Sequence, residues 1–355
     1  MTPRVLVVSN MSPKPSAPLL GQFVDNQVEA LKDAGCDVDY VKPNWNGDGL
    51  LFKLFRYPVF LLQFLFAVVF RRTQYDVIHV HYYYPTILIA ITYRWFVSRK
   101  TKFVVTCHGS DIYLYENPGW LYKKLSNHIH CWIFTSSALK ERFYRKVGSS
   151  KVWSAGFNNK IFNCQSHPDK SSERKYLACM ICHLDTNKGI DRLLDIVQRL
   201  PEHKFALIGT GPLLQKVKQF STQHSNLEVL GALKSQAVKQ VITQSKACLS
   251  LSRNESFGLT ISEAQACGTP VFATETDGSK EQLQDTYRLV PQSNDELELC
   301  NSFVEKLLTL NSLSDSAFVK LSDKVIEETT AFSLTSIAEN LKELYVQLAN
   351  EVKKK

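Results

Sequence analysis

The 355-residue sequence lacks internal repeats, low-complexity tracts and any apolar run long enough to cross a bilayer. Its longest apolar run, Tyr57 to Phe70, has fourteen residues, whereas a membrane-spanning helix needs about twenty. We expect no signal peptide, because the apolar run Val5 to Val8 has only four residues and a polar, proline-rich segment follows it. These absences exclude repeat, low-complexity and multi-span membrane proteins.

The sequence also lacks a disulfide framework. Its nine cysteines are an odd number and are scattered from Cys36 to Cys300, so a reducing cytoplasm is the expected location. Cys179 and Cys182 have the spacing of half a zinc site, but no second pair follows at a suitable spacing. We therefore expect these two residues to be buried and structural.

Length and charge indicate two unequal halves. A chain of 355 residues with 44% hydrophobic content is expected to hold two globular domains. Residues 1–165 contain 20 Lys and Arg against 10 Asp and Glu, a net charge of +10, whereas the remainder carries 22 against 24, a net charge of −2. The basic half should face an anionic partner. Nucleic acid is not expected, because the basic residues form no dense run or known binding motif.

The apolar run Tyr57 to Phe70 lies in this basic half, with Lys53 and Arg56 before it and Arg71 and Arg72 after it. A helix that is apolar around most of its circumference fits either a buried core helix or an element lying in the membrane interface. Both interpretations stay open, and the charge asymmetry slightly favours an anionic membrane surface.

Strand-like apolar runs alternate with helix-like segments, which predicts parallel α/β layers. The first series of predicted strands covers residues 5–9, 37–41, 77–81, 103–106, 130–135 and 151–154. The second series covers residues 176–181, 205–209, 227–230, 247–251 and 271–274. The polar segment Asn163 to Arg174, with Pro168 and three serines, is the expected linker. We therefore predict one domain over residues 1–164 and another over 174–330.

Residues 250–275 are the most informative stretch. Ser256 is a predicted helix cap, and Gly268 and Pro270 close that helix. Glu255 lies just before the helix and Glu263 inside it, roughly 9 Å further along the axis. Free backbone N–H groups at a helix start bind anions, and here they would be those of Phe257, Gly258 and Leu259. A diphosphate with hydroxyl groups at both ends, such as a nucleotide-sugar, suits this arrangement.

This stretch resembles the signature of the retaining nucleotide-sugar glycosyltransferases of family 4. The match is Glu, seven residues, Glu, set in Ser-x-x-Glu-Ser-Phe-Gly-Leu and followed by Glu-Ala-x-Ala-Cys-Gly-x-Pro-Val. The resemblance covers nearly the whole chain and implies the GT-B architecture, an α/β fold in which two Rossmann-like domains face each other across a cleft. It implies that Glu255 holds hydroxyls of the donor sugar near the reacting carbon and that Glu263 holds the ribose. It also implies that the helix expected over 331–355 crosses back to the first domain.

Other stretches resemble the family's site loops, and each follows a predicted strand. Gly21 resembles the glycine that lies against the donor diphosphate. The sequence His-Gly-Ser-Asp, from His108 to Asp111, resembles the active-site loop whose His lies beside the reacting sugar. His79 and His81 share one strand face, and we expect a structural role for both.

In the second half, Lys188 matches the family's lysine that makes a charge-assisted contact to the diphosphate. His183 stands where the family usually has Arg, which is always charged and bidentate, whereas His is only partly protonated near neutral pH. This departure weakens the expected hold on the diphosphate. Three further residues resemble the family's turns around the nucleotide, namely Gly209, Gly211 and Leu230.

A nucleoside diphosphate is a good leaving group when fixed donors meet its developing charge, here a helix N-terminus and Lys188. No Asp-x-Asp pair stands in a loop expected to face the cleft, so we expect neither a metal nor another cofactor. The predicted activity is retaining transfer from a nucleotide-sugar, with a UDP-sugar expected, to a lipid-linked or polysaccharide acceptor. Lipopolysaccharide or exopolysaccharide synthesis at the inner face of the cytoplasmic membrane is the expected setting. Two alternatives stay open, a GT-B nucleotide-sugar epimerase and a catalytically silent, membrane-binding relative.

Overall fold

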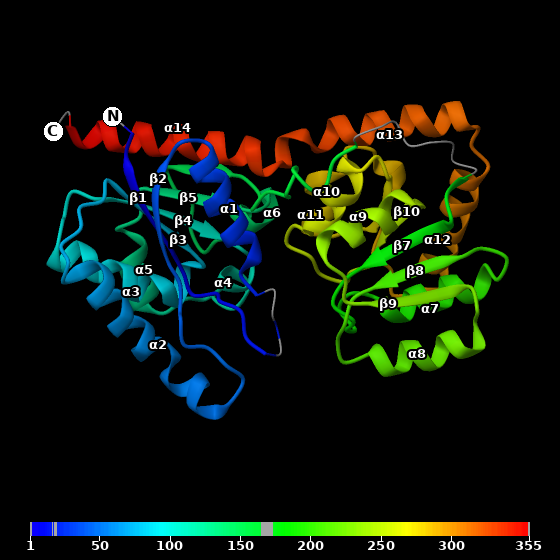
Figure 1. The fold of residues 1–355 in the computed structure, drawn as a ribbon, viewed down its shortest axis with the longest axis horizontal. Helices are drawn as coiled ribbons and strands as arrows, with labels where there is room; N and C mark the ends of the chain where they lie inside the picture. Colours follow the sequence, from blue (N-terminus) through cyan, green and yellow to red (C-terminus); the bar gives the residue numbers. More distant parts are fainter. Residues whose placement is uncertain (1, 16, 18–19, 165–172, 354–355) are drawn as a thin grey trace. The chain divides into compact units, whose positions relative to one another are not determined.

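The computed structural model describes residues 2–15, 17, 20–164 and 173–353 and contains two compact units (Figure 1). Unit 1 comprises residues 1–156 and 334–355, and unit 2 comprises residues 157–333. The chain enters unit 2 between Gly156 and Phe157, several residues before the expected boundary at 164. Most of the expected linker lies outside the described residues.

Unit 1 is built on a parallel sheet of six strands in the order β2-β1-β3-β4-β5-β6. Its strands are β1 (Arg4–Ser9), β2 (Asp37–Val41), β3 (Val77–His81), β4 (Lys102–Cys107), β5 (Cys131–Phe134) and β6 (Ser150–Val152). Most of these strands are buried on both faces, which explains their continuous apolar runs.

Helices cover both faces of this sheet. Val5 and Val7 of β1 point to the face packed by α1 (Gln22–Asp33) and α14 (Leu334–Lys353). Leu6 and Val8 point to the opposite face. That face carries α2 (Leu50–Phe64), η1 (Leu65–Val69), α3 (Tyr83–Phe96) and α5 (Trp120–Ser126). Two short helices, α4 (Ser110–Tyr113) and α6 (Ser137–Glu141), follow β4 and β5.

Unit 2 contains a second parallel sheet of six strands, in the order β12-β11-β10-β7-β8-β9. Its strands are β7 (Tyr176–Ile181), β8 (Phe205–Ile208), β9 (Leu227–Gly231), β10 (Ser245–Ser250), β11 (Val271–Thr274) and β12 (Leu289–Val290). Helices α7 (Ile190–Arg199), α8 (Leu214–Gln223), α12 (Glu296–Asn311) and α13 (Asp315–Thr329) contribute to the core on one face. Helices α9 (Ser235–Thr243) and α10 (Leu259–Ala266) cover the other. The short elements α11 (Asp277–Gln282), η3 (Thr286–Arg288) and η4 (Thr330–Phe332) complete the unit.

The predicted α/β class with two parallel sheets is confirmed. In each sheet the strand order reverses next to the first strand of the unit, β1 in unit 1 and β7 in unit 2. Loops that leave neighbouring strands in opposite directions at such a point open a crevice at the carboxyl edge of the sheet, where ligands of α/β proteins bind. The crevice loops are those after β1 and β3 in unit 1, and after β7 and β10 in unit 2.

Candidate active site

Two loops meet at the reversal point of unit 2, residues 182–189 after β7 and 251–258 after β10. Asn187 joins them. Its backbone oxygen accepts from Arg253 N at 2.7 Å, its side-chain oxygen accepts from Asn254 N at 3.1 Å, and its Nδ2 donates to Asn254 O at 3.0 Å. Three hydrogen bonds from one residue fix the spacing of the two loops before any ligand arrives.

This spacing brings Lys188 and Glu255 together. Lys188 Nζ donates to Glu255 Oε2, and the two side chains are 25% and 18% exposed. Asp185 Oδ1 accepts from Lys188 N at 2.9 Å and thereby holds the lysine's backbone. The pair is shielded enough for its charges to interact strongly, yet both groups remain reachable from solvent. A cation and a hydroxyl acceptor therefore stand side by side at the carboxyl edge of the sheet.

Gly189 allows these loops to touch. Its φ is +72°, and a Cβ at this position would lie 2.2 Å from Leu251 O. Any other residue would have to push the β10 loop away from Lys188. In the Lys188-Gly189 pair, the glycine is thus required for steric reasons and the lysine for its charge.

The predicted helix cap at Ser256 is wrong. Helix α10 begins at Leu259, its N-cap is Gly258 with φ +81°, and no side chain caps it. Phe257 is buried instead, with its carbonyl accepting from Gln282 Nε2 and its ring meeting that of Phe332 edge-on at 5.5 Å between centroids. The helix therefore starts at Leu259, after the left-handed residue Gly258.

The anion-binding end of α10 is therefore displaced along the chain. The first N–H groups of a helix have no partner inside it, and in α10 they belong to Leu259 and Thr260 rather than to Phe257. Glu255 precedes this helix start and remains beside it, because a Cβ on Gly258 would lie 3.0 Å from Glu255 Cγ. The positive end of α10 and the Lys188 ammonium thus lie on the two sides of Glu255.

Glu263 lies in the second turn of α10 and is partly buried. Burial raises the pKa of its carboxyl group to about 7. At neutral pH the group is therefore about half protonated and can accept or donate a hydrogen bond. A carboxyl group poised in this way suits a ligand that brings hydroxyl groups.

The loops after β8 and β9 adjoin the β7 loop. Gly209 has φ +143°, its amide donates to Gly231 O at 2.8 Å, and a Cβ on it would lie 1.8 Å from Cys182 O. Leu184 N donates to Thr210 O at 2.9 Å. His183 and Gly211, also predicted for the nucleotide, lie in the loops after β7 and β8. His183 is exposed, and a Cβ on Gly211 would lie 2.6 Å from Leu184 O. Leu230 is partly buried and lies near the end of β9.

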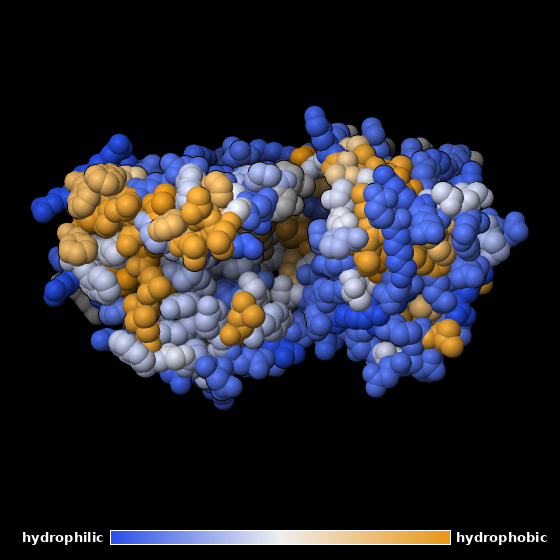
Figure 2. Space-filling view, turned by 90° about the horizontal axis from the view of Figure 1, so that it is seen from below, coloured by the Kyte–Doolittle hydropathy of each residue, from blue (hydrophilic) through white to orange (hydrophobic). Residues whose placement is uncertain are grey.

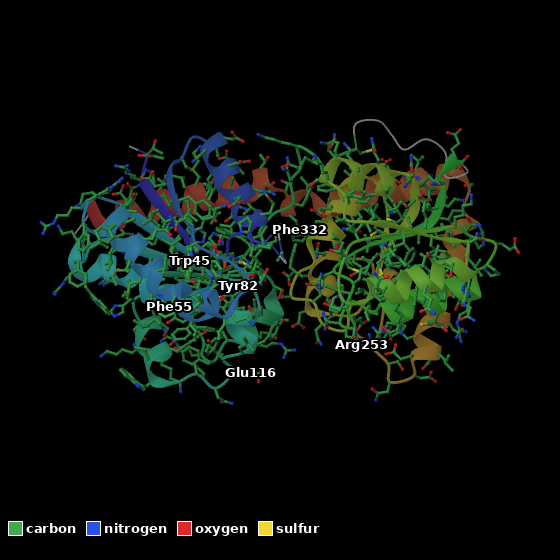
Figure 3. All side chains as sticks on the ribbon, turned by 60° about the horizontal axis from the view of Figure 1, so that its bottom comes forward. Trp45, Phe55, Tyr82, Glu116, Arg253 and Phe332 are labelled. Carbon is green, nitrogen blue, oxygen red and sulfur yellow. The ribbon has the colours of Figure 1, made fainter. Side chains whose placement is uncertain are left out.

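In unit 1 the structure brings the Gly21 segment and His108 together. Gly21 is the N-cap of α1. The ring of Phe23, two residues on, lies 4.9 Å from that of His108. Tyr82, labelled in Figure 3, stacks on His108 at 4.6 Å. His108 follows β4 and is only partly buried, so it stands between two aromatic rings at the carboxyl edge of this sheet.

His81 contacts His108 directly, with 3.0 Å between His81 Nδ1 and His108 Nε2. Burial lowers the pKa of both imidazoles, that of His81 to about 3, so both are neutral and one proton is shared across this hydrogen bond. Position in the sequence did not reveal the pairing. The contact follows from the pairing of β3 with β4, because this pairing places the last residue of β3 beside the loop after β4.

His79 has a purely internal role in unit 1. Its ring nitrogens lie 2.6 Å from Tyr345 Oη and 2.7 Å from Thr106 Oγ1, and the residue is fully buried. Burial lowers its pKa well below the ordinary value. It ties α14 to the sheet and leaves no ring nitrogen for a ligand.

Asp111, for which the family resemblance implies a contact to the donor, braces the His108 loop. Its Oδ1 accepts from the amides of His108 at 3.0 Å and Gly109 at 3.1 Å, and its Oδ2 accepts from Tyr83 N at 2.9 Å. The residue is 2% exposed. Both oxygens are thus engaged by backbone amides, and we assign Asp111 a positioning role.

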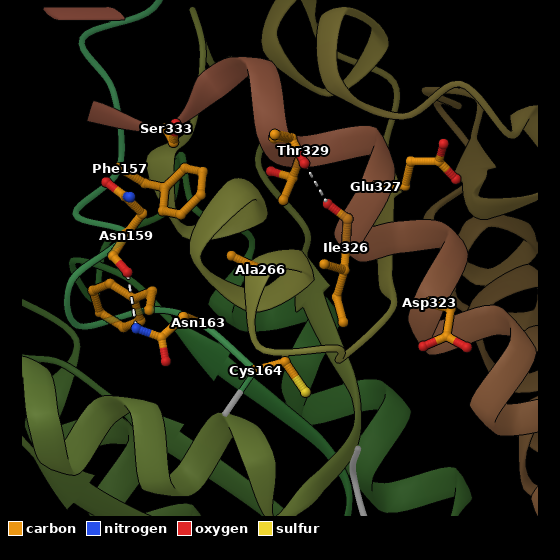
Figure 4. Close-up of a pocket in the computed structure, with 12 residues that line it drawn as sticks. Phe157, Asn159, Asn163, Cys164, Ala266, Asp323, Ile326, Glu327, Thr329 and Ser333 are labelled. Atoms are coloured by element: carbon orange, nitrogen blue, oxygen red, sulfur yellow. Dashed lines mark hydrogen bonds between the residues drawn. The ribbon is translucent and has the colours of Figure 1, made fainter. Parts of the chain in front are cut away.

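A separate cavity of about 580 Å³ lies in unit 2, between the segment after Phe157 and the end of α13 (Figure 4). Its lining includes Phe162, Ala266, Ile326 and Glu327. None of the residues predicted to hold the donor lines it. Among the residues that the structure describes, no group of three or more His, Cys, Asp or Glu side chains could hold a metal.

Comparison with known proteins gives two family matches. Residues 165–320 match the family described as Glycosyl transferases group 1, and residues 20–158 match Glycosyltransferase Family 4. Each match covers less than half of the chain, and together they support a glycosyltransferase of GT-B type. The boundary between the two matches lies close to the junction of units 1 and 2.

The individual relatives of this chain carry names that differ in function. It is 28% identical over 258 residues to N-acetyl-alpha-D-glucosaminyl L-malate synthase of Bacillus anthracis, a match that covers 66% of each chain. It is 26% identical over 198 residues to the phosphatidylinositol N-acetylglucosaminyltransferase gpi3 subunit of Schizosaccharomyces pombe, covering 53% of this chain and 42% of that one. The matches thus span about two thirds or less of these relatives. HepE from Anabaena, solved in complex with UDP, superposes with a TM-score of 0.70 at 16% identity, covering 97% of this chain and all of that one. This likeness shows the GT-B fold.

Proposed function

We propose that this protein is a glycosyltransferase that transfers a sugar, with retention of anomeric configuration, from a nucleoside-diphosphate donor to a lipid-linked or polysaccharide acceptor. The observation that carries the proposal is the Lys188–Glu255 pair at the start of α10, with Glu263, whose pKa burial raises to about 7, one turn further on. The Lys188 ammonium and the amides at the start of α10 can thus donate to a diphosphate. The carboxyl groups of Glu255 and Glu263 can accept from the hydroxyls of the donor sugar and of the ribose.

In the proposed reaction the bond between the anomeric carbon and the diphosphate oxygen breaks, and a bond from an acceptor oxygen to that carbon forms. The acceptor hydroxyl passes its proton to an oxygen of the departing diphosphate, which leaves with the electron pair of the broken bond. Lys188 and the amides at the start of α10 stabilise the charge that develops on the departing oxygen. Glu255 holds donor-sugar hydroxyls near the reacting carbon, and Glu263 accepts from the ribose. No residue described in this site is assigned a metal.

His108 is assigned to the reacting sugar on the strength of the family resemblance. Its neutral imidazole, bonded to His81, suits hydrogen bonding to a hydroxyl rather than pairing with a phosphate. His183 is exposed in the loop after β7, and we assign it to assist Lys188 with the diphosphate.

Two relatives support the finer parts of the proposal. The HepE structure contains UDP, which supports a uridine nucleotide as the donor's leaving group. The name of the Schizosaccharomyces pombe relative gives a phosphatidylinositol acceptor, which supports a lipid-linked acceptor for this chain. The name of the Bacillus anthracis relative gives L-malate, a small acid, as the acceptor, so the class of acceptor needs a direct test.

The experiment is a screen of nucleotide-sugars for thermal stabilisation, followed by transfer assays with the donor that stabilises most. Lys188→Gln and Glu255→Gln are each expected to lower transfer at least 100-fold, as removal of a single transition-state donor does (~3 kcal/mol). Lys175→Gln and Glu228→Gln are matched controls, because these residues form an ion pair at 2.8 Å near the opposite end of β7. Unchanged transfer in the Glu255 variant would end the enzymatic proposal.

Product analysis separates the alternatives. A retained anomeric configuration in the transferred sugar is the expected result, and an inverted one would contradict retention. A new nucleotide-sugar formed without any acceptor would identify an epimerase. Donor binding without any product in the presence of lipid-linked and glycan acceptors would identify a silent relative.

A further inference from the structure

The helix formed by α2 and η1 has two apolar sides. Phe60, Phe64 and Val68, at helical spacing, are at most 1% exposed and belong to the core of unit 1. A second stripe faces outward and is 51% to 65% exposed; it comprises Leu51, Leu54, Phe55, Leu62, Phe66 and Phe70, and we call it the α2 ridge. The core therefore accounts for only one of the two stripes.

The α2 ridge is held in a fixed orientation. Asn10 Nδ2 donates to Tyr57 Oη at 3.3 Å, Gln63 Nε2 donates to Lys42 O at 2.8 Å, and Asn44 N donates to Gln63 Oε1 at 3.1 Å. These bonds anchor the helix to the loop after β1 and to the end of β2. The ridge is thus displayed by the sheet and cannot rotate inward without breaking them.

The exposed apolar area is large and continuous along the helix. Figure 2 shows hydrophobic residues gathered over the side of unit 1 that carries α2, and Figure 3 labels Phe55 on this helix. At the end of α3, which packs on η1, Trp95 and Phe96 are 58% and 65% exposed. Soluble monomers seldom expose contiguous apolar surface of this kind unless it binds something.

The segment that carries the α2 ridge has only basic charged residues. Residues 49–74 contain no Asp or Glu, while Lys53 lies within the helix and Arg71 and Arg72 follow it. These three side chains are exposed, and no carboxylate of the described part of the chain pairs with them within 4 Å. Lys123 and Lys124 on α5 are also exposed. An apolar, aromatic stripe bordered by unpaired cations is complementary to an anionic lipid surface.

We propose that the α2 ridge inserts among the headgroups and upper acyl chains of an anionic bilayer, with the helix lying parallel to the membrane plane. The expectation that no segment is long enough to cross a bilayer is wrong, because the helix extends beyond the run Tyr57 to Phe70. By length and composition alone, Leu50–Val69 could cross a membrane, with 20 residues and a mean hydropathy of 1.6. Crossing would withdraw Phe60, Phe64 and Val68 from the core and break the bonds of Tyr57 and Gln63. The parallel orientation keeps all of these contacts and buries only the outward stripe.

The inner leaflet of the cytoplasmic membrane is the surface that fits best. The described part of the chain contains no disulfide, which suits a reducing compartment, and inner leaflets carry anionic lipids. This inference does not rest on the proposed glycosyl transfer, although a bilayer-bound enzyme would meet lipid-linked acceptors at the surface it occupies.

The test is co-sedimentation of the full chain with vesicles of phosphatidylcholine containing about 30% phosphatidylglycerol, an anionic lipid. Leu54→Glu and Phe66→Glu are each expected to lower the partition coefficient on the order of tenfold, by losing one buried apolar side chain. Arg71→Gln and Arg72→Gln are expected to lower it about fivefold each, an effect that high salt abolishes. Leu297→Glu is the matched control, because Leu297 lies in unit 2 and, like Leu54, is 62% exposed.

Each outcome decides the proposal. Binding that needs the anionic lipid, is weakened by the ridge variants and is unaffected by Leu297→Glu supports it. Absence of vesicle binding, or equal loss in all variants, overturns it. A dimer that forms with rising protein concentration without vesicles, and that Leu54→Glu dissociates, would also overturn the proposal. It would show that a second copy of the chain covers the α2 ridge. Donor binding measured on the same variants should be unchanged, which separates failure of this proposal from failure of the proposed function.

Discussion

The raised pKa of Glu263 predicts how donor binding depends on pH. Burial raises this pKa to about 7, so the unliganded protein holds about half a proton on the carboxyl group at pH 7. A ribose diol that donates to the carboxylate favours the charged form and lowers the pKa in the complex. Donor binding should then release a proton, and affinity should rise with pH until the group is fully ionised.

The magnitude follows from the two protonation states. If the complex contains only the carboxylate, affinity scales with the ionised fraction of Glu263 in the free protein. For a pKa of about 7 this fraction rises about tenfold between pH 6 and pH 8 and then reaches a plateau, equivalent to roughly 1.4 kcal/mol of binding free energy. At pH 7 about half a proton should leave per donor bound.

Isothermal titration calorimetry with an intact nucleotide-sugar tests this prediction. Both phosphates of such a donor are esterified and do not titrate near neutral pH, whereas a free nucleoside diphosphate would confuse the result. Titrations in buffers of different ionisation enthalpy count the released protons. Glu263→Gln should give weaker, pH-independent binding. A flat profile in the wild type, or the same slope in Glu263→Gln, would refute the role given to this residue.

Three further predictions concern residues around the two sites. The substitution His81→Phe keeps a ring beside His108 but removes the hydrogen bond between the two residues. We expect kcat to fall ~10- to 100-fold and donor affinity to stay unchanged. A parallel loss of donor affinity would contradict a positioning role for His81. Gly189→Ala should cost at least about 2 kcal/mol in unfolding free energy and abolish donor stabilisation, because its Cβ would meet Leu251 O. Arg288→Met should lower unfolding free energy by about 3–5 kcal/mol in denaturant titrations, since it strands the buried Glu328 carboxylate, and adding Glu328→Leu should restore much of the loss.

The strands of both sheets could be predicted because their signal is local. The mostly apolar runs Val77–His81 and Tyr176–Ile181 coincide with β3 and β7, since a parallel strand buried on both faces favours apolar residues. Strand β12 was missed because two residues, Leu289–Val290, make no recognisable run. The position of the unit boundary could not be derived either, because Gly156 and Phe157 differ in no local pattern from the residues around them.

The errors in the site have tertiary causes. Ser256 has the sequence features of a helix cap, but the burial of Phe257 against Phe332, far away in the chain, delays the helix to Leu259. His81 and His108 meet only because β3 and β4 are neighbours in the sheet. For α2, the sequence indicated a helix with apolar residues around most of its circumference. Only the fold shows which of these residues are buried in the core and which are exposed. Resemblance to the family supplied the roles of Lys188 and Glu255, and the structure supplied their pairing.

The most direct test of the account is a crystal structure of the protein with an intact nucleotide-sugar. The account predicts the diphosphate within hydrogen-bonding distance of Lys188 Nζ and the amides of Leu259 and Thr260, with the ribose hydroxyls on Glu263 and the sugar on Glu255. A donor bound in the cavity beside α13, or one at α10 with Glu255 and Glu263 turned away from it, would contradict the account.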